Sequence, residues 1–356
     1  MISALDTLRQ WGLKTYEQSP FLIAGPCSAE SREQVLETAR AIQHLPVSIF
    51  RAGVWKPRTL PETFPGMGNV ALSWLQEAKA ETGLPIAIEI DRPAHLEEAL
   101  QAGIDVFWLG ARTTVNPFAV EELAAAFSGV DKPLLVKNPI TPDLGAWVAA
   151  IERLRNRDIK KIGVVLRGFV NRHPSKWRYE PEWDMVLKLR QIFPDLPYLC
   201  DPSHIAGNAS MIFDICQQAL DLNFHGLMIE THFNPAKALS DAEQQITPLA
   251  LEDILDRLIL KNPDFAAGSD HNELGRLRQK IDRIDQKLLE TLAARMELVQ
   301  QIGLLKKAKG LAVFQPARWD HVIERVHDFA RNRGLSEQFL EDIFNRIHQE
   351  SIRKQQ

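Results

Sequence analysis

Residues 46–59 read Pro-Val-Ser-Ile-Phe-Arg-Ala-Gly-Val-Trp-Lys-Pro-Arg-Thr. The stretch begins as a short β-type run and ends in three cations, Arg51, Lys56 and Arg58. Pro57 fixes its own φ and favours extended backbone at the preceding residue, so this strand end leads into a stiff loop. Cations held in this way are suited to binding a carboxylate and phosphates. Taken alone, the stretch is equally compatible with a solvated basic loop.

The same kind of strand end recurs along most of the chain. Eight short apolar or β-branched runs occur at 21–27, 48–54, 85–90, 106–110, 134–137, 162–167, 198–201 and 226–230. Between them lie amphipathic segments of helical length, such as 32–43, 69–81, 95–102, 117–127 and 145–157. This alternation predicts an α/β fold, a (β/α)8 TIM barrel. A doubly wound open sheet is the alternative, although no Gly-x-Gly-x-x-Gly follows the first run.

Composition restricts the class of protein. The 356 residues carry a net charge of −4, with 45% hydrophobic and 25% charged residues. These values are ordinary for a globular protein and favour neither nucleic acid nor a membrane as partner. No apolar run is long enough for a transmembrane helix, and the first residues are unlike a signal peptide. Three cysteines, an odd number, are typical of a reducing compartment, so we expect a cytoplasmic protein.

Candidate metal ligands stand at three of the predicted strand ends. Cys27, His204 and Glu230 occupy these ends, and Asp241 follows eleven residues after Glu230. One thiolate, one imidazole and two carboxylates suit a borderline divalent ion such as Mn2+, Fe2+, Co2+ or Zn2+. The four positions have no diagnostic spacing, and the alternatives are a small buried cysteine and a core histidine.

Cations at the strand ends outnumber the acids that remain once a metal is bound. They are Arg51, Lys56, Arg58, Arg112, Lys137 and Arg167. Arginine makes bidentate contacts with carboxylates and phosphates, whereas lysine can both bind an anion and transfer a proton. We therefore expect small, multiply anionic substrates that carry phosphate, and no organic cofactor.

Six short segments occur in order within about residues 15–262: Gly25-Pro26-Cys27-Ser28, Arg51-Ala52-Gly53, Lys56-Pro57-Arg58-Thr59, Gly110-Ala111-Arg112, Asp201-Pro202-Ser203-His204 and Lys237-Ala238-Leu239-Ser240-Asp241. Together they closely resemble the 3-deoxy-D-arabino-heptulosonate 7-phosphate (DAHP) synthase family, in its shorter type I form without an N-terminal regulatory domain. That family condenses phosphoenolpyruvate with erythrose 4-phosphate and opens the shikimate pathway. The related 3-deoxy-D-manno-octulosonate 8-phosphate synthases share the barrel but usually carry Asn where this chain has Pro57-Arg58-Thr59, so they rank second.

The resemblance implies roles for the site residues. The metal, with Mn2+ as the first candidate, would be bound by Cys27, His204, Glu230 and Asp241. Phosphoenolpyruvate would be surrounded by Arg51, Lys56, Arg112, Lys137 and Arg167. Arg58 and Thr59 would hold erythrose 4-phosphate, and Lys137 is the candidate proton donor, with Lys56 as a second catalytic residue. The chain departs from the family pattern after Lys137, where it has Asn138-Pro139 and many relatives carry Arg-Gly. This difference affects the expected shape of the loop, not the assignment of the lysine.

The C-terminal residues lose the strand signal. Residues 260–269 read as a linker, and from residue 272 onward apolar side chains recur at spacings of three and four. The pattern predicts a helix of about 38 residues, roughly 57 Å long, which a partner chain must cover. Two shorter helices are expected at about 319–332 and 336–353. The predicted organisation is therefore a barrel at 1–262, a linker at 263–270 and an all-α three-helix dimerising domain at 271–356.

The apolar face of the long helix is interrupted at Arg295, which needs an anionic partner if it is buried. Lys306 falls on the same helical face, and Arg318 opens the next helix. Ser351 and Gln355 share a face of the third helix. Arg278 lies about 25 Å from Arg295 along the axis, so it can reach the same pocket only from an antiparallel partner. We predict a domain-swapped homodimer, and assemblies of more than two chains are also compatible with the sequence. The alternative is a helix that serves only for dimerisation, in which Arg295 interrupts the apolar face without binding a ligand.

This constellation resembles the all-helical chorismate mutase family, in which Arg278, Arg295, Lys306, Arg318, Ser351 and Gln355 fall on pocket positions. That family converts chorismate to prephenate without a nucleophile, because cations select the compact dicarboxylate and donors stabilise charge on the ether oxygen. Lys306 and Gln355 would be those donors. Two departures are Trp319, where a Glu often holds the substrate hydroxyl, and Gln315, where Asp is common. The alternative is a regulatory module that binds chorismate or prephenate without useful turnover.

Overall fold

The computed structural model describes residues 4–56, 64–171, 175–260 and 271–355. The chain forms two compact units, Met1–Pro263 and Asp264–Gln356. The predicted linker, 263–270, lies outside the described residues, and the predicted domain limits remain predictions. No helix among the described residues is both long enough and apolar enough to cross a membrane.

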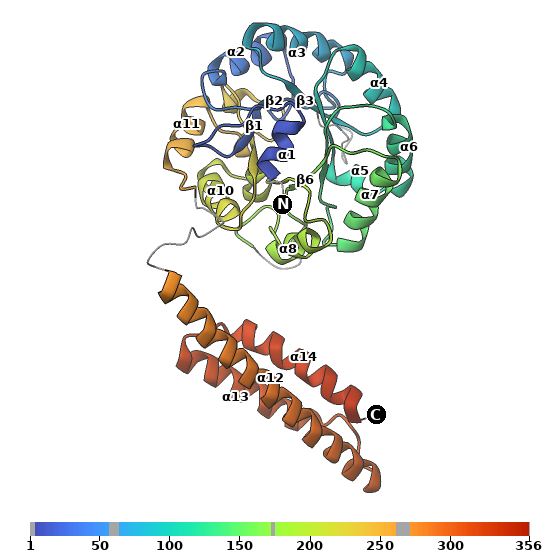
Figure 1. Ribbon diagram of the computed structural model, residues 1–356, viewed down its shortest axis with the longest axis vertical. Coiled ribbons are helices and arrows are strands. Elements are labelled where there is room, and N and C mark those ends of the chain that lie inside the picture. The colour runs from blue at the N-terminus through green and yellow to red at the C-terminus, as the bar shows by residue number, and fades with distance from the viewer. Residues whose placement is uncertain (1–3, 57–63, 172–174, 261–270, 356) are drawn as a thin grey trace. The chain divides into compact units, whose positions relative to one another are not determined.

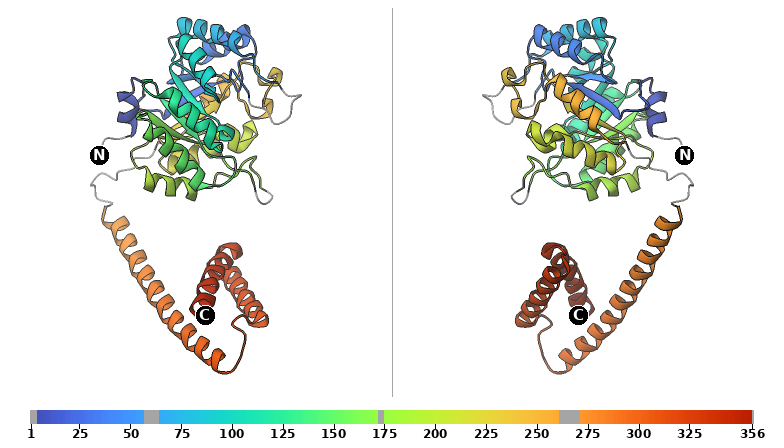
Figure 2. Two further views of the ribbon diagram at one scale, coloured as in Figure 1. Left: turned by 90° about the vertical axis from the view of Figure 1, so that its right-hand side faces the viewer. Right: turned by 90° about the vertical axis from the view of Figure 1, so that its left-hand side faces the viewer.

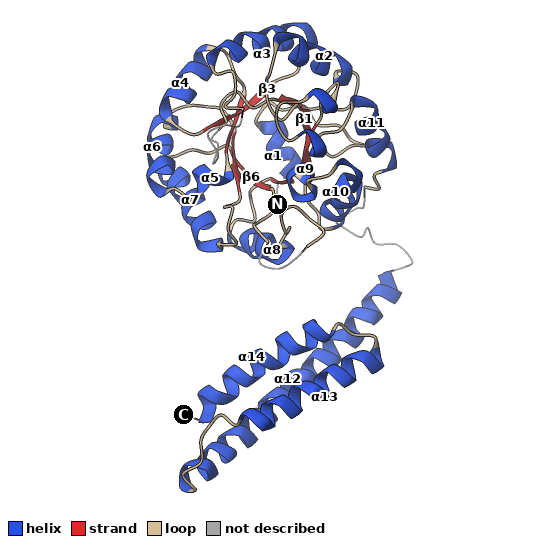
Figure 3. Cartoon of the chain, turned by 180° about the vertical axis from the view of Figure 1, so that it is seen from behind, coloured by secondary structure: helices blue, strands red, loops and turns tan. Residues whose placement is uncertain are grey.

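Within the described residues, eight parallel strands close into a barrel in the order of the sequence, as the ring of strands in Figure 3 shows. They are β1 Phe21–Gly25, β2 Ile49–Arg51, β3 Ile86–Ile90, β4 Val106–Leu109, β5 Leu134–Lys137, β6 Ile162–Leu166, β7 Tyr198–Cys200 and β8 Gly226–Glu230. The last strand pairs with the first, and Gly25 lies opposite Glu230. The predicted barrel is confirmed. The open-sheet alternative is wrong, because an open sheet would leave β1 and β8 unpaired.

Helices surround the strands (Figure 1). The longer ones are α2 Arg32–Ile42, α3 Asn69–Thr82, α4 Pro93–Gln101, α6 Pro117–Phe127, α7 Leu144–Asn156, α8 Trp183–Ile192, α10 Ile212–Asp221 and α11 Pro248–Arg257. Several begin at a side chain that accepts a backbone N–H in the first turn, as Ser31, Asn116, Asp143 and Thr247 do. The remaining helices are short: α1 Ala4–Gln10, α5 Ala111–Thr114 and α9 Pro202–Ala206.

Two apolar cores hold the barrel together. The outer core packs strands against helices and includes the fully buried Trp147. The inner core fills the barrel and contains Trp108, together with Phe21 and Val106, which begin β1 and β4. Leu8 of α1 belongs to this inner core, and α1 lies across one opening of the barrel (Figure 1). Because α1 closes the end where the strands begin, the other end is left for a site.

The C-terminal unit consists of α12 His271–Ala308, α13 Pro316–Arg333 and α14 Glu337–Gln355 (Figure 2). The three predicted helices are confirmed. The second begins three residues earlier than expected, because Pro316 is a favourable first helical residue. It ends at Gly334, which adopts the left-handed conformation. The unit packs α14 against both α12 and α13.

The N-terminal half of α12 presents an exposed apolar face. Leu277, Ile281, Ile284 and Leu288 recur at spacings of three and four, and each is about half exposed or more. Monomeric proteins rarely expose a continuous apolar stripe of this kind. This apolar stripe is the surface that, from the sequence pattern, we expect a partner chain to cover.

Candidate active sites

Three of the four predicted metal ligands meet at the open end of the barrel. Cys27 follows β1, Glu230 ends β8, and Asp241 lies in the loop after β8. One ligand atom from each of these residues lies within 4.8 Å of the others. The fourth residue, His204 of α9, is adjacent, because its Nδ1 lies 3.9 Å from Glu230 Oε1. The four residues come from the ends of three strands, β1, β7 and β8, so closure of the barrel brings them together.

The chemistry of this cluster fits a divalent cation. Glu230 Oε1 and His204 Nδ1 are buried, yet among the described residues neither makes a hydrogen bond. Burial, and next the charge of Glu230, raises the pKa of the Cys27 thiol to about 12, against the opposing effect of Lys56. A thiolate at this position therefore needs positive charge beyond that of Lys56, which a bound metal would supply.

Gly53 allows the basic loop to approach the cluster. A Cβ atom added to Gly53 would lie 2.6 Å from Lys56 Cε and 2.7 Å from the Cys27 carbonyl oxygen. The absence of a side chain lets Lys56 Nζ reach Cys27 Sγ at 3.0 Å. The ends of the first and second strands are therefore in close contact. Arg58 and Thr59, on the same loop, lie outside the described residues.

Arg51 lies behind the cluster and is 1% exposed. Its Nη2 lies 3.2 Å from Glu230 Oε1 and donates to the Cys27 carbonyl oxygen at 3.4 Å. The guanidinium also sits over the indole ring of Trp108, 4.9 Å from its centroid. Arg51 is thus fixed on several sides and neutralises the buried carboxylate.

Lys137 occupies the end of β5 and is only 4% exposed. Its ammonium donates to Asp201 Oδ2 at 2.8 Å, and it lies 5.5 Å from the centroid of Trp108. Asp201 Oδ2 also lies 2.9 Å from His204 Nδ1, although the two atoms are not aligned for a hydrogen bond. Asp201 therefore connects the candidate proton donor to the candidate metal site.

Arg167, predicted at the sixth strand end, and Arg178 lie over the ring of Tyr179, and the charge of Arg112, predicted at the fourth, also acts on it. Arg167 is buried and lies over the Tyr179 ring at 3.7 Å. Burial raises the pKa of Tyr179, but Arg167, Arg178 and Arg112 together lower it below its usual value. Arg112 itself is exposed. Three guanidinium groups around one phenol form a cationic surface that can receive an anion.

Asn138, the departure from the family pattern, ties two strand ends together. Its side chain donates to the carbonyl oxygens of Pro139 at 2.7 Å and Gly168 at 2.9 Å. It also accepts the backbone N–H of Arg167 at 2.6 Å. The amide therefore fixes the backbone next to both Lys137 and Arg167, and the lysine keeps its position in the site.

Three contributors to this site were not assigned from the sequence. Asp201 pairs with Lys137, Arg178 Nη1 lies 2.9 Å from Asp241 Oδ1, and Gln244 Nε2 donates to Glu230 Oε2 at 2.6 Å. Asp201 directly follows β7, so its position after a strand was a usable signal. Arg178 lies on a loop and Gln244 ends a single 3-10 turn, Ala242–Gln244, so no periodicity marks either side chain as one that turns toward the barrel.

A second group of predicted residues meets between α12 and α14. Arg295 Nη1 donates to Ser351 Oγ at 2.7 Å, and Gln355 Nε2 donates to the Ser351 carbonyl oxygen at 3.0 Å. Gly303 makes this approach possible, because a Cβ atom there would lie 2.9 Å from Gln355 Cα. Lys306 Nζ donates to the Val313 carbonyl oxygen at 2.6 Å, which holds the end of α12 against the following segment.

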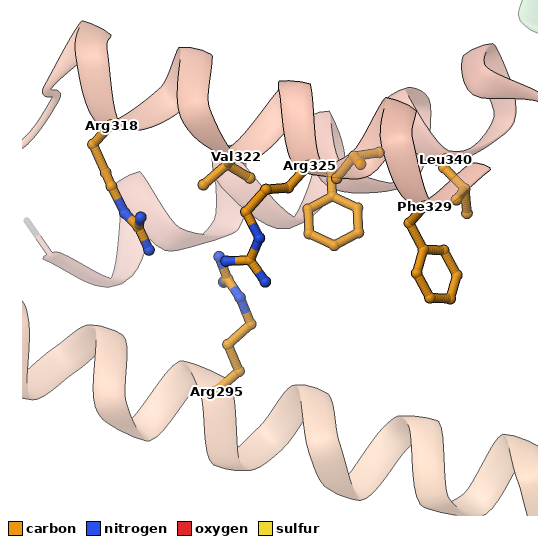
Figure 4. Close-up of a pocket in the computed structure, with 8 residues that line it drawn as sticks. Arg295, Arg318, Val322, Arg325, Phe329 and Leu340 are labelled. Atoms are coloured by element: carbon orange, nitrogen blue, oxygen red, sulfur yellow. The ribbon is translucent and has the colours of Figure 1, made fainter. Parts of the chain in front are cut away.

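Arg295 also faces a cavity of about 430 Å³ lined by Arg318, Val322, Arg325, Val326, Phe329, Leu340 and Phe344. Figure 4 shows Arg295 reaching from α12 toward Arg325 of α13, with Arg318 to one side. Among the described residues, none of these three guanidinium groups forms a salt bridge. Arg325 was not predicted. Arg278, by contrast, is exposed on the far part of α12 and does not join the group within one chain.

At its strand ends the closed barrel gathers a thiol, carboxylates and several cations, an arrangement suited to binding small anions beside a divalent cation. The chain belongs to the DAHP synthetase I family, which matches residues 12–261. Residues 277–356 match the family Chorismate mutase type II. The chain is thus a fusion of domains from these two families, as the sequence motifs predicted.

Individual relatives agree with both halves. A phospho-2-dehydro-3-deoxyheptonate aldolase of Thermotoga maritima is 32% identical over 229 residues, 63% of this chain and 64% of that protein. A crystal structure of a Thermotoga maritima enzyme of that name superposes with a TM-score of 0.60 at 28% identity, covering 67% of this chain and 68% of the other. A 4-amino-4-deoxychorismate mutase of Streptomyces venezuelae is 35% identical over 85 residues, 24% of this chain and 82% of that protein. The chain therefore spans under two thirds of the length of the first of these relatives, the Thermotoga maritima aldolase matched by sequence.

Proposed function

We propose that the barrel is a metal-dependent DAHP synthase, which condenses phosphoenolpyruvate with erythrose 4-phosphate. The observation that carries this proposal is the cluster of Cys27, Glu230 and Asp241 within 4.8 Å of one another, flanked by buried cations at the strand ends. His204 completes the proposed ligand set, and Mn2+ is the first candidate, with Fe2+, Co2+ and Zn2+ as alternatives. When bound, the ion supplies a Lewis acid that polarises an aldehyde oxygen.

The residues of the chain position and protonate the substrates. Lys56, Arg112 and Arg167 bind the phosphate and carboxylate of phosphoenolpyruvate, while Arg51 keeps the buried Glu230 ionised. The ammonium of Lys137, held by Asp201 at 2.8 Å, is the proton donor. Arg58 and Thr59 are assigned to erythrose 4-phosphate on the family resemblance alone.

A synthase assay on the full chain tests this proposal. Consumption of phosphoenolpyruvate should require erythrose 4-phosphate, stop after chelation and return with Mn2+. Cys27→Ser should lower the metal content of the purified protein, whereas Cys216→Ser, a matched change of a buried cysteine in α10, should not. Turnover with a five-carbon aldose phosphate instead would identify an octulosonate 8-phosphate synthase, which is the alternative for the barrel.

We further propose that the helical unit converts chorismate to prephenate as a homodimer. Arg295, Lys306 and Arg318 bind the two carboxylates, and Ser351 holds Arg295 in place at 2.7 Å. Gln355 and Lys306 donate hydrogen bonds to the ether oxygen as charge develops on it. Arg278 completes the pocket from the partner chain, and the apolar stripe on α12 is the surface that pairs with that chain. Higher assemblies are compatible with this dimer.

Chorismate disappearance, measured with the full chain, tests the mutase. Arg295→Ala should abolish turnover, whereas the same change at the exposed Arg333 should leave it intact. The alternative is a regulatory module, which is favoured by one observation: Trp319 stacks on His348 where relatives often carry an acid. Prephenate binding without chorismate turnover would support that alternative. A cytoplasmic location is also part of the proposal, and all three cysteines are free.

A further inference from the structure

Two buried polar atoms of the helical unit lack a hydrogen-bond partner among the described residues. They are Nε2 of His348 and Oε1 of Gln355, both on α14. The two residues are seven positions apart, with Ser351 between them, so all three lie on one face of the helix. A buried polar atom without a partner costs free energy unless a bound molecule completes its hydrogen bond.

Aromatic side chains from the preceding segments hold the imidazole of His348. Trp319, in the first turn of α13, stacks on it with centroids 4.1 Å apart and planes 22° apart. Phe314 meets it edge to face at 5.6 Å. Packing on two sides fixes the orientation of the ring, which a side chain needs if it is to recognise a ligand group.

The surroundings of the imidazole also favour its uncharged form. Burial lowers the pKa of His348, and the charges of Arg295 and Lys306 lower it further. A neutral imidazole offers one donor and one acceptor nitrogen, so it can pair with a hydroxyl in either direction. The indole of Trp319 has only a donor and no acceptor, so it does not reproduce the carboxylate that relatives carry at its position.

We propose that His348 recognises the hydroxyl group of the mutase substrate, and that Trp319 holds the imidazole ring for this task. This proposal rests on the proposed chorismate mutase function. The two substrate carboxylates pair with the arginines, and the ether oxygen pairs with Lys306 and Gln355. The hydroxyl is then the one polar group of the substrate that still needs a partner, and His348 Nε2, like Gln355 Oε1, is a buried atom that lacks one among the described residues.

The test uses the full chain and a pair of oxabicyclic dicarboxylate transition-state analogues, one with the hydroxyl and one without it. Calorimetry should show that removing the hydroxyl weakens binding to the unaltered protein about tenfold or more. His348→Leu should abolish most of this difference and raise the KM for chorismate more than it lowers kcat. His348→Gln, which retains a donor and an acceptor, should restore part of the difference.

His321→Leu, on the exposed surface of α13, is the matched control and should behave like the unaltered protein. If His348→Leu unfolds, Trp319→Ala provides a second variant, and it should reduce the same difference by freeing the ring. The proposal is overturned if folded His348→Leu and Trp319→Ala proteins still bind the analogue with the hydroxyl as much more tightly than the analogue without it as the unaltered protein does. Absence of chorismate turnover by the unaltered protein contradicts the mutase function instead, and the analogue pair still decides whether His348 binds the hydroxyl.

Discussion

At the scale of single residues, the barrel site depends on charges that are buried in pairs. Lys137 and Asp201, like Arg51 and Glu230, lie almost entirely out of water. Removing one member of such a pair leaves an uncompensated buried charge, which typically costs about 3–5 kcal/mol. Loss of activity in a single variant can therefore reflect either chemistry or folding, and each experiment must separate the two.

We predict that Lys137→Met lowers the kcat of the synthase by a factor of about 100 to 10,000, because the proposed proton donor is lost. The variant should also be less stable, since Asp201 is left unpaired. Adding Asp201→Asn should recover part of the free energy of unfolding without recovering turnover. Denaturant titration and steady-state rates check both statements, with Lys160→Met on the surface as control. Turnover close to normal in the single variant would remove Lys137 as the donor.

A second residue, His225, predicts a pH effect on the stability of the barrel. Its Nδ1 accepts the backbone N–H of Tyr198 at 2.8 Å, and burial, together with Arg190, lowers its pKa to about 4. In the unfolded chain the pKa is about 6.5. The unfolded state therefore takes up the proton first, so stability is full above about pH 6.5 and falls as the pH drops toward 4.

His225→Asn should flatten this dependence, because asparagine retains an acceptor but does not titrate. The measurement is the free energy of unfolding by urea at several pH values between 7 and 4. The contribution of His225 should amount to at most about 3 kcal/mol over that range. His44→Asn, at an exposed histidine, is the control. Equal slopes for the unaltered protein and His225→Asn would contradict the assignment.

At the scale of elements, the sequence pattern predicted most of the architecture. The strands and three C-terminal helices follow from periodicity and from turn residues, which act locally. α1 was not predicted, because seven residues with few apolar positions give a weak signal, and only the closed barrel creates the opening that Leu8 fills. The same distinction holds for the site. Cys27 and Glu230 stand at recognisable strand ends, whereas Arg178 depends on how a loop folds back.

One prediction concerns the contact between α12 and α14. Gly303→Ala should lower the free energy of unfolding of the helical unit by about 1–3 kcal/mol, because the new methyl group meets the backbone of Gln355 at 2.9 Å. This loss should exceed the gain in helix propensity, which is about 1 kcal/mol. The mutase rate should fall as Gln355 is displaced. Thermal unfolding and chorismate assays check this, with Gln301→Ala as a helix-propensity control. A stabilised, fully active variant would contradict it.

At the scale of the whole molecule, the exposed stripe on α12 predicts the oligomeric state. Ile284 is 64% exposed and Leu288 is 56% exposed, so replacing both by Glu should leave the isolated chain folded. It should convert dimers to monomers in sedimentation and remove mutase turnover, since Arg278 must come from a partner. A matched change at the exposed Lys280 and Lys287 should do neither. Dimers that persist in the Ile284→Glu/Leu288→Glu variant would show that another surface joins the chains.

The helix α12 carries Arg295 and Lys306 at one end and Arg278 and the apolar stripe at the other. If each pocket is built from two copies of this helix, its activity obeys mass action. Below the dissociation constant of the dimer, the rate of chorismate turnover should rise with the square of the protein concentration rather than in proportion to it. Dilution alone would then abolish turnover in the pocket without any effector. The concentration of the protein in a cell would itself determine the fraction of chains that are active.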